Sequence, residues 1–353
     1  MESSDRADHV AGALTYPNPN EQGMSMQPRR PTNLQTLLRF AIDATNKTEE
    51  DGPTSSAVSA LDEERRRFLE EALKSLTVDV PKVLQRGIKI LTNVEFIKSV
   101  QLGQPVPDDI RAAFNNMMEF VDDIDVAMDF QKLGGFAVFP ICYGSENEDI
   151  RIRTSQLLAE ICQNNPHCQA RVLEYGLLNV LLHLANSEKG YALAKCISAI
   201  SCSVREYDPG CRELIAQGGC DTLTSALEQP HVSARTKAAF LIRYLCQNYP
   251  DAKEKFIQNN IVKIIAEQLK KGRDASSEQL LSVLQTLLEG QDSTVLQQFR
   301  EPSLNLKQII VDHLDVPEFV GDGFIEEKEY CYAVLRVFDS CPQVEVVNSE
   351  VDR

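Results

Sequence analysis

The sequence predicts an all-α fold built from tandem helical units of about forty residues. Three glycines, Gly134, Gly176 and Gly218, are spaced 42 residues apart, and Asn260 follows at the next step of the same length. Glycine and asparagine are the residues that most readily end a helix in a left-handed turn. Armadillo and HEAT repeats have periods of about 40–47 residues, so we expect a right-handed α-solenoid of this type.

The residues that precede these turns repeat as well. The run CQNNP at 162–166 returns 84 residues later as CQNYP at 246–250, and Val204-Arg205-Glu206 fills the intermediate position. Because helix-ending residues and the apolar pattern between them share one period, the sequence predicts about four central repeats.

Both ends of the chain differ from the repeats. Residues 1–31 contain several prolines and few large apolar side chains, so they are predicted to form a disordered tail. We expect an N-terminal helical cap at 59–107, armadillo-like repeats at 108–290, a C-terminal helical cap at 291–341 and a second tail at 342–353. Caps are expected because terminal repeats must cover a core that would otherwise be exposed.

Residues 32–58 are predicted to hold a short amphipathic helix and then a flexible linker. Apolar side chains follow the spacing of one helix face at Leu34, Leu37, Leu38, Ala41 and Ile42. Helices shorter than about 12 residues are marginal in water, so this one is not stable alone.

The composition favours a protein partner in the cytoplasm or nucleus. With 52 acidic and 36 basic residues, the formal net charge is −16, which opposes binding to nucleic acid or to an anionic membrane. No stretch resembles a signal peptide or approaches the roughly 18 apolar residues of a membrane span. The ten cysteines form no C-x-x-C pair, so we expect reduced thiols in the core.

The helix before each break carries the strongest functional pattern. Stacking its copies at the 42-residue step gives apolar columns at 157/199/241, 158/200/242 and 162/204/246, which should face the core. Five polar or mixed columns share the opposite face, because they lie at i, i+3, i+7, i+10 and i+11. These columns hold Arg153, Gln156, Glu160, Gln163, Asn164, Lys195, Ser198, Cys202, Arg205, Glu206, Lys237, Phe240, Tyr244, Gln247 and Asn248.

In armadillo solenoids the corresponding helices line the concave surface, so this face is predicted to bind a partner. It includes a basic row, Arg153, Lys195 and Lys237, on an otherwise acidic chain. An ordinary solvated helix face would show the same spacing, and the sequence leaves both interpretations open. Armadillo proteins that bind extended peptides use rows of Trp and Asn on this helix. This chain has no Trp, which disfavours that mode of binding.

No catalytic, metal or cofactor site is expected. The chain lacks the glycine-rich phosphate loops, the H-E-x-x-H helix and the G-x-S-x-G turn. His167-Cys168 could form half of a metal site or a Cys/His dyad, but a loop with a partly buried thiol explains the pair better. The protein is therefore not expected to be an enzyme.

Four segments together resemble the cytosolic Hsp70-binding protein family, the armadillo-type nucleotide exchange factors of Hsp70 chaperones. They are NLQxLLxxAI at 33–42, EERRxFLxEA at 63–72, AISCxVRE at 199–206 and REPxLxL at 300–306. The resemblance implies that the concave face binds the second lobe of the Hsp70 nucleotide-binding domain, opens its cleft and lets ADP leave. A luminal branch of the family carries a signal peptide and a retention signal, and this chain shows neither, so we expect it in the cytoplasm. We also expect a monomer.

In this family the N-terminal segment is thought to occupy the chaperone's client site, a role that would fall to Leu34, Leu37, Leu38, Phe40 and Ile42. Docking of this helix on the protein's own core is the alternative. On the solenoid itself we expect the basic row to steer the encounter and Phe240 and Tyr244 to anchor it. The alternative function is an armadillo-like adaptor that binds another folded protein without affecting nucleotide.

Overall fold

The computed structural model describes residues 78–290, 293–315 and 324–339. The chain divides into two compact units, Met1–Asp79 and Val80–Arg353, and nearly all described residues belong to the second. Several predicted segments lie outside the described residues, namely 1–31, most of 59–79, 342–353 and 32–58 with Leu34, Leu37, Leu38, Phe40 and Ile42.

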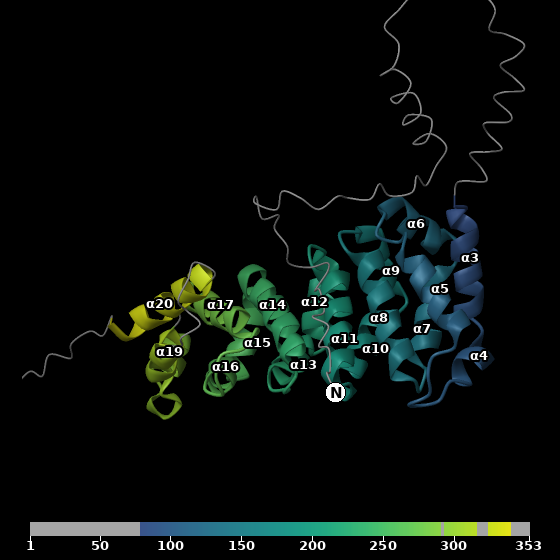
Figure 1. Ribbon diagram of the computed structural model, residues 1–353. Helices are drawn as coiled ribbons and strands as arrows, with labels where there is room; N and C mark the ends of the chain where they lie inside the picture. The colour runs from purple at the N-terminus through teal and green to yellow at the C-terminus, as the bar shows by residue number, and fades with distance from the viewer. Residues whose placement is uncertain (1–77, 291–292, 316–323, 340–353) are drawn as a thin grey trace, which may run out of the picture. The chain divides into compact units, whose positions relative to one another are not determined.

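Every regular element in the described ranges is a helix, and the helices stack side by side along the second unit (Figure 1). One row of helices, which we call the ladder, runs the length of this unit. The ladder consists of α3 (Val80–Leu91), α5 (Asp108–Met118), α8 (Glu148–Cys162), α11 (Gly190–Val204), α14 (Val232–Asn248), α17 (Ser277–Leu288) and α20 (Ile325–Asp339).

The remaining helices form a second row and a set of shorter connecting helices. The second row consists of α7 (Val138–Tyr143), α10 (Leu177–Ser187), α13 (Gly219–Leu227), α16 (Ile261–Leu269) and α19 (Leu306–Leu314). The connecting helices are α4 (Val94–Lys98), α6 (Ile124–Lys132), η1 (Gly135–Ala137), α9 (Pro166–Glu174), α12 (Asp208–Ala216), α15 (Pro250–Gln258), α18 (Ser293–Phe299) and η2 (Pro302–Leu304).

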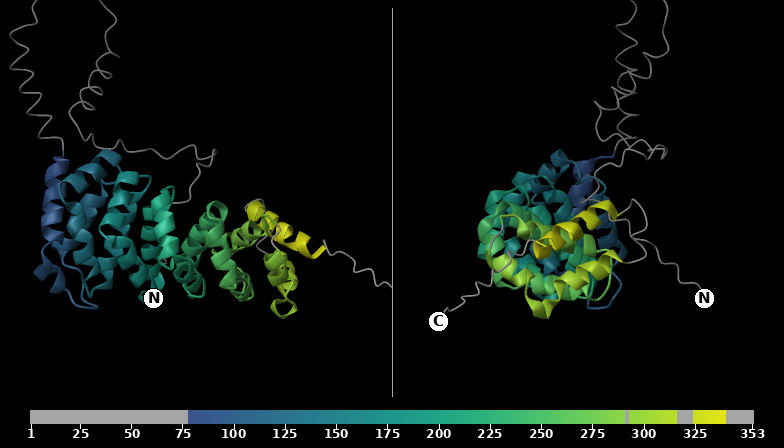
Figure 2. Two further views of the ribbon diagram at one scale, coloured as in Figure 1. Left: turned by 180° about the vertical axis from the view of Figure 1, so that it is seen from behind. Right: turned by 90° about the vertical axis from the view of Figure 1, so that its left-hand side faces the viewer.

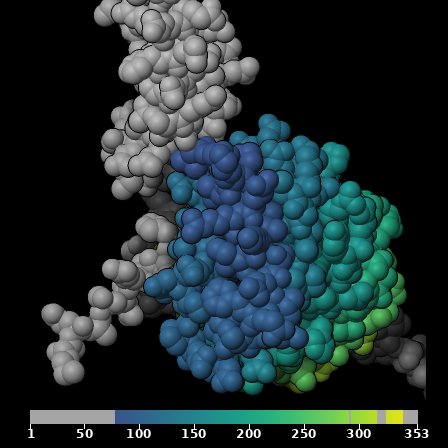
Figure 3. Space-filling model, turned by 90° about the vertical axis from the view of Figure 1, so that its right-hand side faces the viewer, coloured from purple at the N-terminus to yellow at the C-terminus, as the bar shows by residue number. Residues whose placement is uncertain are grey.

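Each repeat therefore has three helices, the last of which joins the ladder. Four such triplets, α6–α8, α9–α11, α12–α14 and α15–α17, follow one another, and the end-on view of Figure 2 shows later helices overlying earlier ones. The helices α18, α19 and α20 repeat the pattern once more, so the segment predicted as a cap adds a further step to the ladder. At the other end, α3 buries one face and presents its other face on the surface seen in Figure 3.

The left-handed turns at the 42-residue period are confirmed. The backbone angle φ is +79° at Gly134, +64° at Gly176, +80° at Gly218 and +55° at Asn260. Gly176, Gly218 and Asn260 immediately precede the second helix of their repeats, and Gly134 precedes the short η1 that leads into α7. Asn305, with φ of +50°, takes the same place before α19. The sequence pattern missed Asn305 because it follows Asn260 by 45 residues instead of 42.

The 84-residue repetition marks a second, longer period in the contacts between repeats. Arg151 donates a hydrogen bond to the carbonyl of Ser145 (2.8 Å) and forms an ion pair with Glu188. Arg235, 84 residues later, donates to the carbonyl of Gln229 (2.8 Å) and forms an ion pair with Asp274. The intermediate repeat has Leu193 at this position, buried in the core.

The 84-residue period also appears in the side chains that bond to the ends of two ladder helices, α11 and α17. Gln169 Nε2 donates to the carbonyls of Cys202 (2.8 Å) and Arg205 (3.0 Å) at the end of α11. Lys253, also 84 residues later, donates from Nζ to the carbonyls of Thr286 (3.1 Å) and Glu289 (2.6 Å) at the end of α17. Carbonyls at helix ends lack partners within the helix, so these side chains satisfy them and fasten the first helix of a repeat to the end of its third helix.

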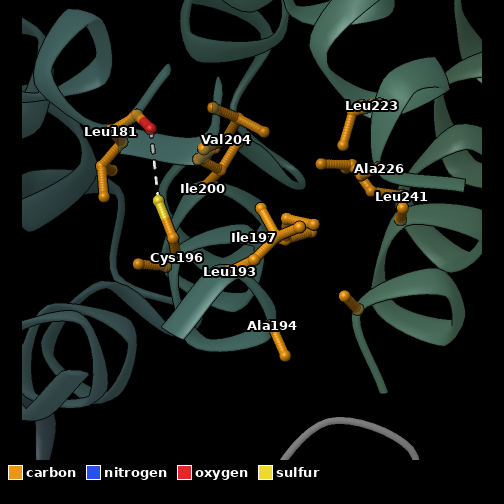
Figure 4. Close-up of a cluster of buried hydrophobic side chains, with 14 of the residues drawn as sticks. Leu181, Leu193, Ala194, Cys196, Ile197, Ile200, Val204, Leu223, Ala226 and Leu241 are labelled. Carbon is orange, nitrogen blue, oxygen red and sulfur yellow. Dashed lines mark hydrogen bonds between the residues drawn. The ribbon is translucent and has the colours of Figure 1, made fainter. Parts of the chain in front are cut away.

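The predicted core columns are confirmed. All nine residues at 157/199/241, 158/200/242 and 162/204/246 are buried. Figure 4 shows how α11 contributes Leu193, Ile197, Ile200 and Val204 to this core, opposite side chains of α13 and α14. Cys196 joins them, and its thiol donates a hydrogen bond to the carbonyl of Leu181 at 3.2 Å.

The cysteines behave as core residues. The nine described cysteines are all free, and eight of them are buried. Burial raises the pKa of the Cys142 thiol to about 12, so this thiol is protonated and unreactive at neutral pH. Cys202, on the ladder, is the half-buried one.

Candidate protein-binding face

The fifteen predicted face residues lie on three adjacent ladder helices and on the turns that end two of them. Helix α11 packs against both α8 and α14, which brings their solvent sides into one surface. None of the fifteen side chains is buried: ten are half-buried and five are exposed. The five exposed residues stand at the end of each helix copy, namely Gln163, Asn164, Glu206, Gln247 and Asn248.

The prediction that all five columns are helical is wrong for two of the three copies. Helix α8 ends at Cys162 and α11 ends at Val204, so Gln163, Asn164, Arg205 and Glu206 belong to turns. Asn164 (φ +53°) and Glu206 (φ +59°) both adopt the left-handed conformation. Only α14 continues through both columns, with Gln247 and Asn248 in its last turn.

The basic row lies along the middle of this face. Arg153, Lys195 and Lys237 are all half-buried, and none forms an ion pair with another described residue within 4 Å. Burial lowers the pKa of the Lys237 ammonium, and repulsion from Lys195 and Arg205 lowers it further, against an opposing effect of Cys202. Like charges are thus held close together on a chain whose net charge is −16.

Two cations of the row, Arg153 and Lys195, contact neutral side chains. Arg153 Nη1 donates a hydrogen bond of 3.1 Å to Asn115 Oδ1 on α5. The Lys195 ammonium lies 4.9 Å from the centre of the Tyr191 ring, one turn earlier on α11. Such contacts orient a positive charge without neutralising it.

Glu160 is one of the two acidic residues of the face, and the other is Glu206. Burial raises the pKa of its carboxyl, repulsion from Asp122 adds to the shift, and Lys195 opposes it. Among the fifteen face residues, the four cations Arg153, Lys195, Arg205 and Lys237 outnumber the two carboxylates, so positive charge prevails on this face.

The two predicted anchors, Phe240 and Tyr244, form a cluster with Arg205. The Arg205 guanidinium lies 4.6 Å from the Phe240 ring centre and 5.6 Å from that of Tyr244. The Tyr244 hydroxyl accepts a hydrogen bond of 2.8 Å from the Glu206 backbone N–H. Tyr244 therefore supports the left-handed turn after α11, in addition to presenting a half-buried ring to solvent.

A pocket of about 440 Å³ opens at the N-terminal end of the same face, between α5, α8 and α11. Its lining combines apolar and polar side chains: Phe114, Asn115, Met118, Asp149, Ile152, Arg153, Gln156 and Tyr191. The predicted face included only Arg153 and Gln156 of these.

The sequence did contain a signal for part of this lining. Extending two face columns by one more 42-residue step toward the N-terminus gives Phe114 and Met118 on α5. Extending the face by one helical turn, four residues before Arg153 and Lys195, gives Asp149 and Tyr191. Asn115 and Ile152 lie off both patterns and required the structure.

The described residues provide no support for catalysis. The Cys168 thiol is fully buried, and burial raises its pKa to about 11, so it cannot form a reactive dyad with the exposed His167. Within the described ranges, no group of three or more His, Cys, Asp and Glu side chains is arranged to hold a metal ion. Among the same residues, no helix has the length and apolar character needed to cross a bilayer.

The sequence is similar to known Hsp70-binding proteins and nucleotide exchange factors. The family model described as nucleotide exchange factor Fes1 matches residues 34–130. Hsp70-binding protein 1 of Homo sapiens is 28% identical over 330 residues, covering 89% of this chain and 87% of that protein. The Hsp70 nucleotide exchange factor FES1 of Mycosarcoma maydis is 23% identical over 158 residues, covering 45% of this chain and 40% of that protein.

Solved structures identify the fold. A designed armadillo repeat protein superposes with a TM-score of 0.54 at 12% identity, covering 70% of this chain and 99% of its own. An engineered protein superposes with a TM-score of 0.58 at 14% identity, covering 75% of this chain and 98% of its own. The predicted armadillo-like α-solenoid is therefore confirmed.

Proposed function

We propose that this chain is an Hsp70 co-chaperone that promotes nucleotide exchange, because it is similar to Fes1 and to Hsp70-binding protein 1. The observation that carries the proposal is the extent of the similarity. The match to human Hsp70-binding protein 1 covers 89% of the chain, so it extends well beyond the segment of the family model and includes α8, α11 and α14.

The ladder face, formed by the fifteen face residues on α8, α11 and α14 and on the turns after the first two, is the surface that we assign to the chaperone. Its half-exposed side chains come from neighbouring helices spaced about 8–10 Å apart, which gives a broad surface instead of a narrow cleft. Its basic row lacks ion-pair partners among the described residues, and a row of this kind suits an acidic patch on a folded protein.

Binding alone is enough for this activity. If the protein holds the Hsp70 nucleotide-binding domain with its cleft open, it weakens ADP binding, and ADP weakens its own binding by the same factor. ADP then leaves, ATP enters and the client is released. No residue of this chain has to touch the nucleotide. The protein would act as a monomer in the cytoplasm, where cytosolic Hsp70 resides.

Stopped-flow release of a fluorescent ADP analogue from purified cytosolic Hsp70 tests the proposal. We expect the protein to accelerate release in a concentration-dependent way. The variant Lys195→Glu/Lys237→Glu should lose most of this acceleration, because it reverses two charges of the basic row. The matched control is Lys263→Glu/Lys270→Glu, which reverses two exposed charges at α16, outside the ladder.

Two outcomes would contradict the proposal in different ways. Binding to Hsp70 without any acceleration would favour the adaptor function over exchange. If Lys195→Glu/Lys237→Glu still accelerates ADP release and Lys263→Glu/Lys270→Glu does not, the exchange activity stands but the binding surface lies outside the ladder.

A further inference from the structure

We propose that the pocket between α5, α8 and α11 receives an apolar side chain of the chaperone, and that carboxylates beside that side chain lie along the basic row. This inference rests on the proposed function and specifies the partner chemistry of the same face. It adds an anchoring site of which the predicted face included only Arg153 and Gln156.

The first argument is the shape and lining of the pocket. Its volume of about 440 Å³ falls within the range of about 300–1,000 Å³ that is usual for ligand sites. Phe114 is only 1% exposed and forms part of a rigid floor, whereas the Tyr191 ring is 41% exposed at the rim. Met118 and Ile152 are half-buried between them. An apolar side chain entering here would cover aromatic and aliphatic surface that water now contacts.

The second argument is the distribution of charge around the pocket. The lining holds one carboxylate, Asp149, and one guanidinium, Arg153, so the pocket itself is close to neutral. Beyond it the basic row continues on the side of α11 and α14, along Lys195 and then Lys237. A partner that fits both features has an apolar side chain for the pocket and acidic neighbours on the side of α11 and α14.

The third argument is the physical continuity of the pocket with the basic row. Arg153 belongs to both, and its 3.1 Å hydrogen bond to Asn115 fixes the guanidinium at their boundary. Tyr191 forms part of the pocket wall and also carries the Lys195 ammonium 4.9 Å from its ring centre. With ladder helices about 8–10 Å apart, the pocket and the basic row together span about 20–30 Å. A surface of this breadth suits a folded partner better than a single side chain.

The decisive experiment measures the affinity for the isolated Hsp70 nucleotide-binding domain by calorimetry at low and high salt. Tyr191→Ser removes the aromatic rim, and Gln156→Trp fills the pocket with the protein's own side chain. The control is Tyr175→Ser, which removes an aromatic ring of similar exposure, 52%, at the end of α9 and outside the ladder. Tyr175 packs on Phe136 with ring centres 5.7 Å apart, so the control tests for loss of packing as well.

We expect both pocket variants to weaken binding about 10- to 30-fold, as loss of an interface hot spot does, while the control binds like the wild type. The loss caused by Tyr191→Ser should persist at high salt, because burial of apolar surface is not screened by ions. The loss caused by Lys195→Gln should shrink at high salt, since it removes only a charge. Circular dichroism and thermal unfolding verify that each variant is folded.

The failures can be told apart. If the wild type does not bind the domain, the proposed function fails and the inference fails with it. If the wild type binds and accelerates release but both pocket variants bind equally well, only the pocket assignment is overturned. A loss with Tyr175→Ser as large as with Tyr191→Ser, or a Tyr191→Ser loss that disappears at high salt, would also overturn it.

Discussion

The central ladder face and the C-terminal end of the array treat their charged side chains in opposite ways. At the C-terminal end, Arg273 donates from Nε and Nη2 to the two carboxylate oxygens of Glu327, at 3.2 and 2.8 Å. His313 Nε2 lies 2.8 Å from the same carboxylate, which is only 2% exposed. On the central face, Lys195 and Lys237 have no ion-pair partner among the described residues.

This difference separates charges that hold the array together from charges available to a partner. The buried Glu327 of α20 links His313 of α19 to Arg273 of the loop before α17. Removing the carboxylate leaves the other two groups without their shared partner. A half-exposed cation without a partner contributes little to folding, and exposed pairs in general contribute only about 0–1 kcal/mol. The following variants test whether the separation is real.

The largest expected effect is that of Glu327→Ala. It leaves Arg273 and His313 without their shared carboxylate, which should destabilise the C-terminal repeat by about 3–5 kcal/mol. Urea unfolding followed by far-UV circular dichroism measures the loss. A loss below about 1 kcal/mol would mean that the pair behaves as an exposed one.

Two of the ladder arginines, Arg235 and Arg153, give the most direct contrast. Arg235 is 6% exposed and paired with Asp274, so Arg235→Ala should cost about 2–4 kcal/mol. Arg153→Ala should stay within about 0.5 kcal/mol in the same unfolding experiment, as surface substitutions do. Equal losses would remove the distinction between structural and available charges.

Acidification should weaken the C-terminal end. Burial by itself would raise the pKa of Glu327, but its hydrogen bonds with His313 and Arg273 outweigh burial and hold the pKa below its ordinary value. A carboxyl with a lowered pKa stabilises the fold above its unfolded pKa, and this contribution is lost as the pH falls through the folded pKa. Unfolding free energies at pH 7 and near pH 4 should therefore differ more for the wild type than for Glu327→Gln. Parallel slopes for the two proteins would contradict this assignment.

A smaller loss is expected from Tyr244→Phe. The substitution keeps the ring under Arg205 but removes the hydroxyl that accepts the Glu206 N–H bond, which should cost about 1 kcal/mol. Thermal unfolding detects the change, and chaperone affinity should be unaffected if the ring alone faces the partner. Weaker binding at unchanged stability would assign the hydroxyl to the interface.

The smallest effect on stability is expected from Lys195→Gln/Lys237→Gln. Burial and mutual repulsion disfavour the Lys237 ammonium, so removing both charges should change the unfolding free energy by no more than about 0.5 kcal/mol. Affinity for the Hsp70 nucleotide-binding domain should fall at low salt. A large loss of stability would show that the row serves the fold instead of a partner.

Features that depend on the type of one residue could be predicted from the sequence. The left-handed turns at Gly176 and Gly218 follow from conformations that glycine adopts without strain, and their period gave the repeat length. The buried columns followed from helical periodicity, because core residues must recur on one side of each helix. The turn at Asn305 was missed since its spacing departs from the period.

The candidate site was predictable only in part. The fifteen face residues proved to be accessible, but four of them lie in turns, because α8 ends at Cys162 and α11 ends at Val204. The pocket combines side chains from three helices, and two of its residues follow no column of the pattern.

The sequence by itself determined the repeat length, the all-α class, the core columns and the acidic balance of this protein, because each depends on residue type and spacing along the chain. The tertiary structure alone decided which charges are neutralised, where Arg205 stacks and where the pocket opens. Those features depend on side chains about forty residues apart, and their distances are fixed only when neighbouring repeats pack.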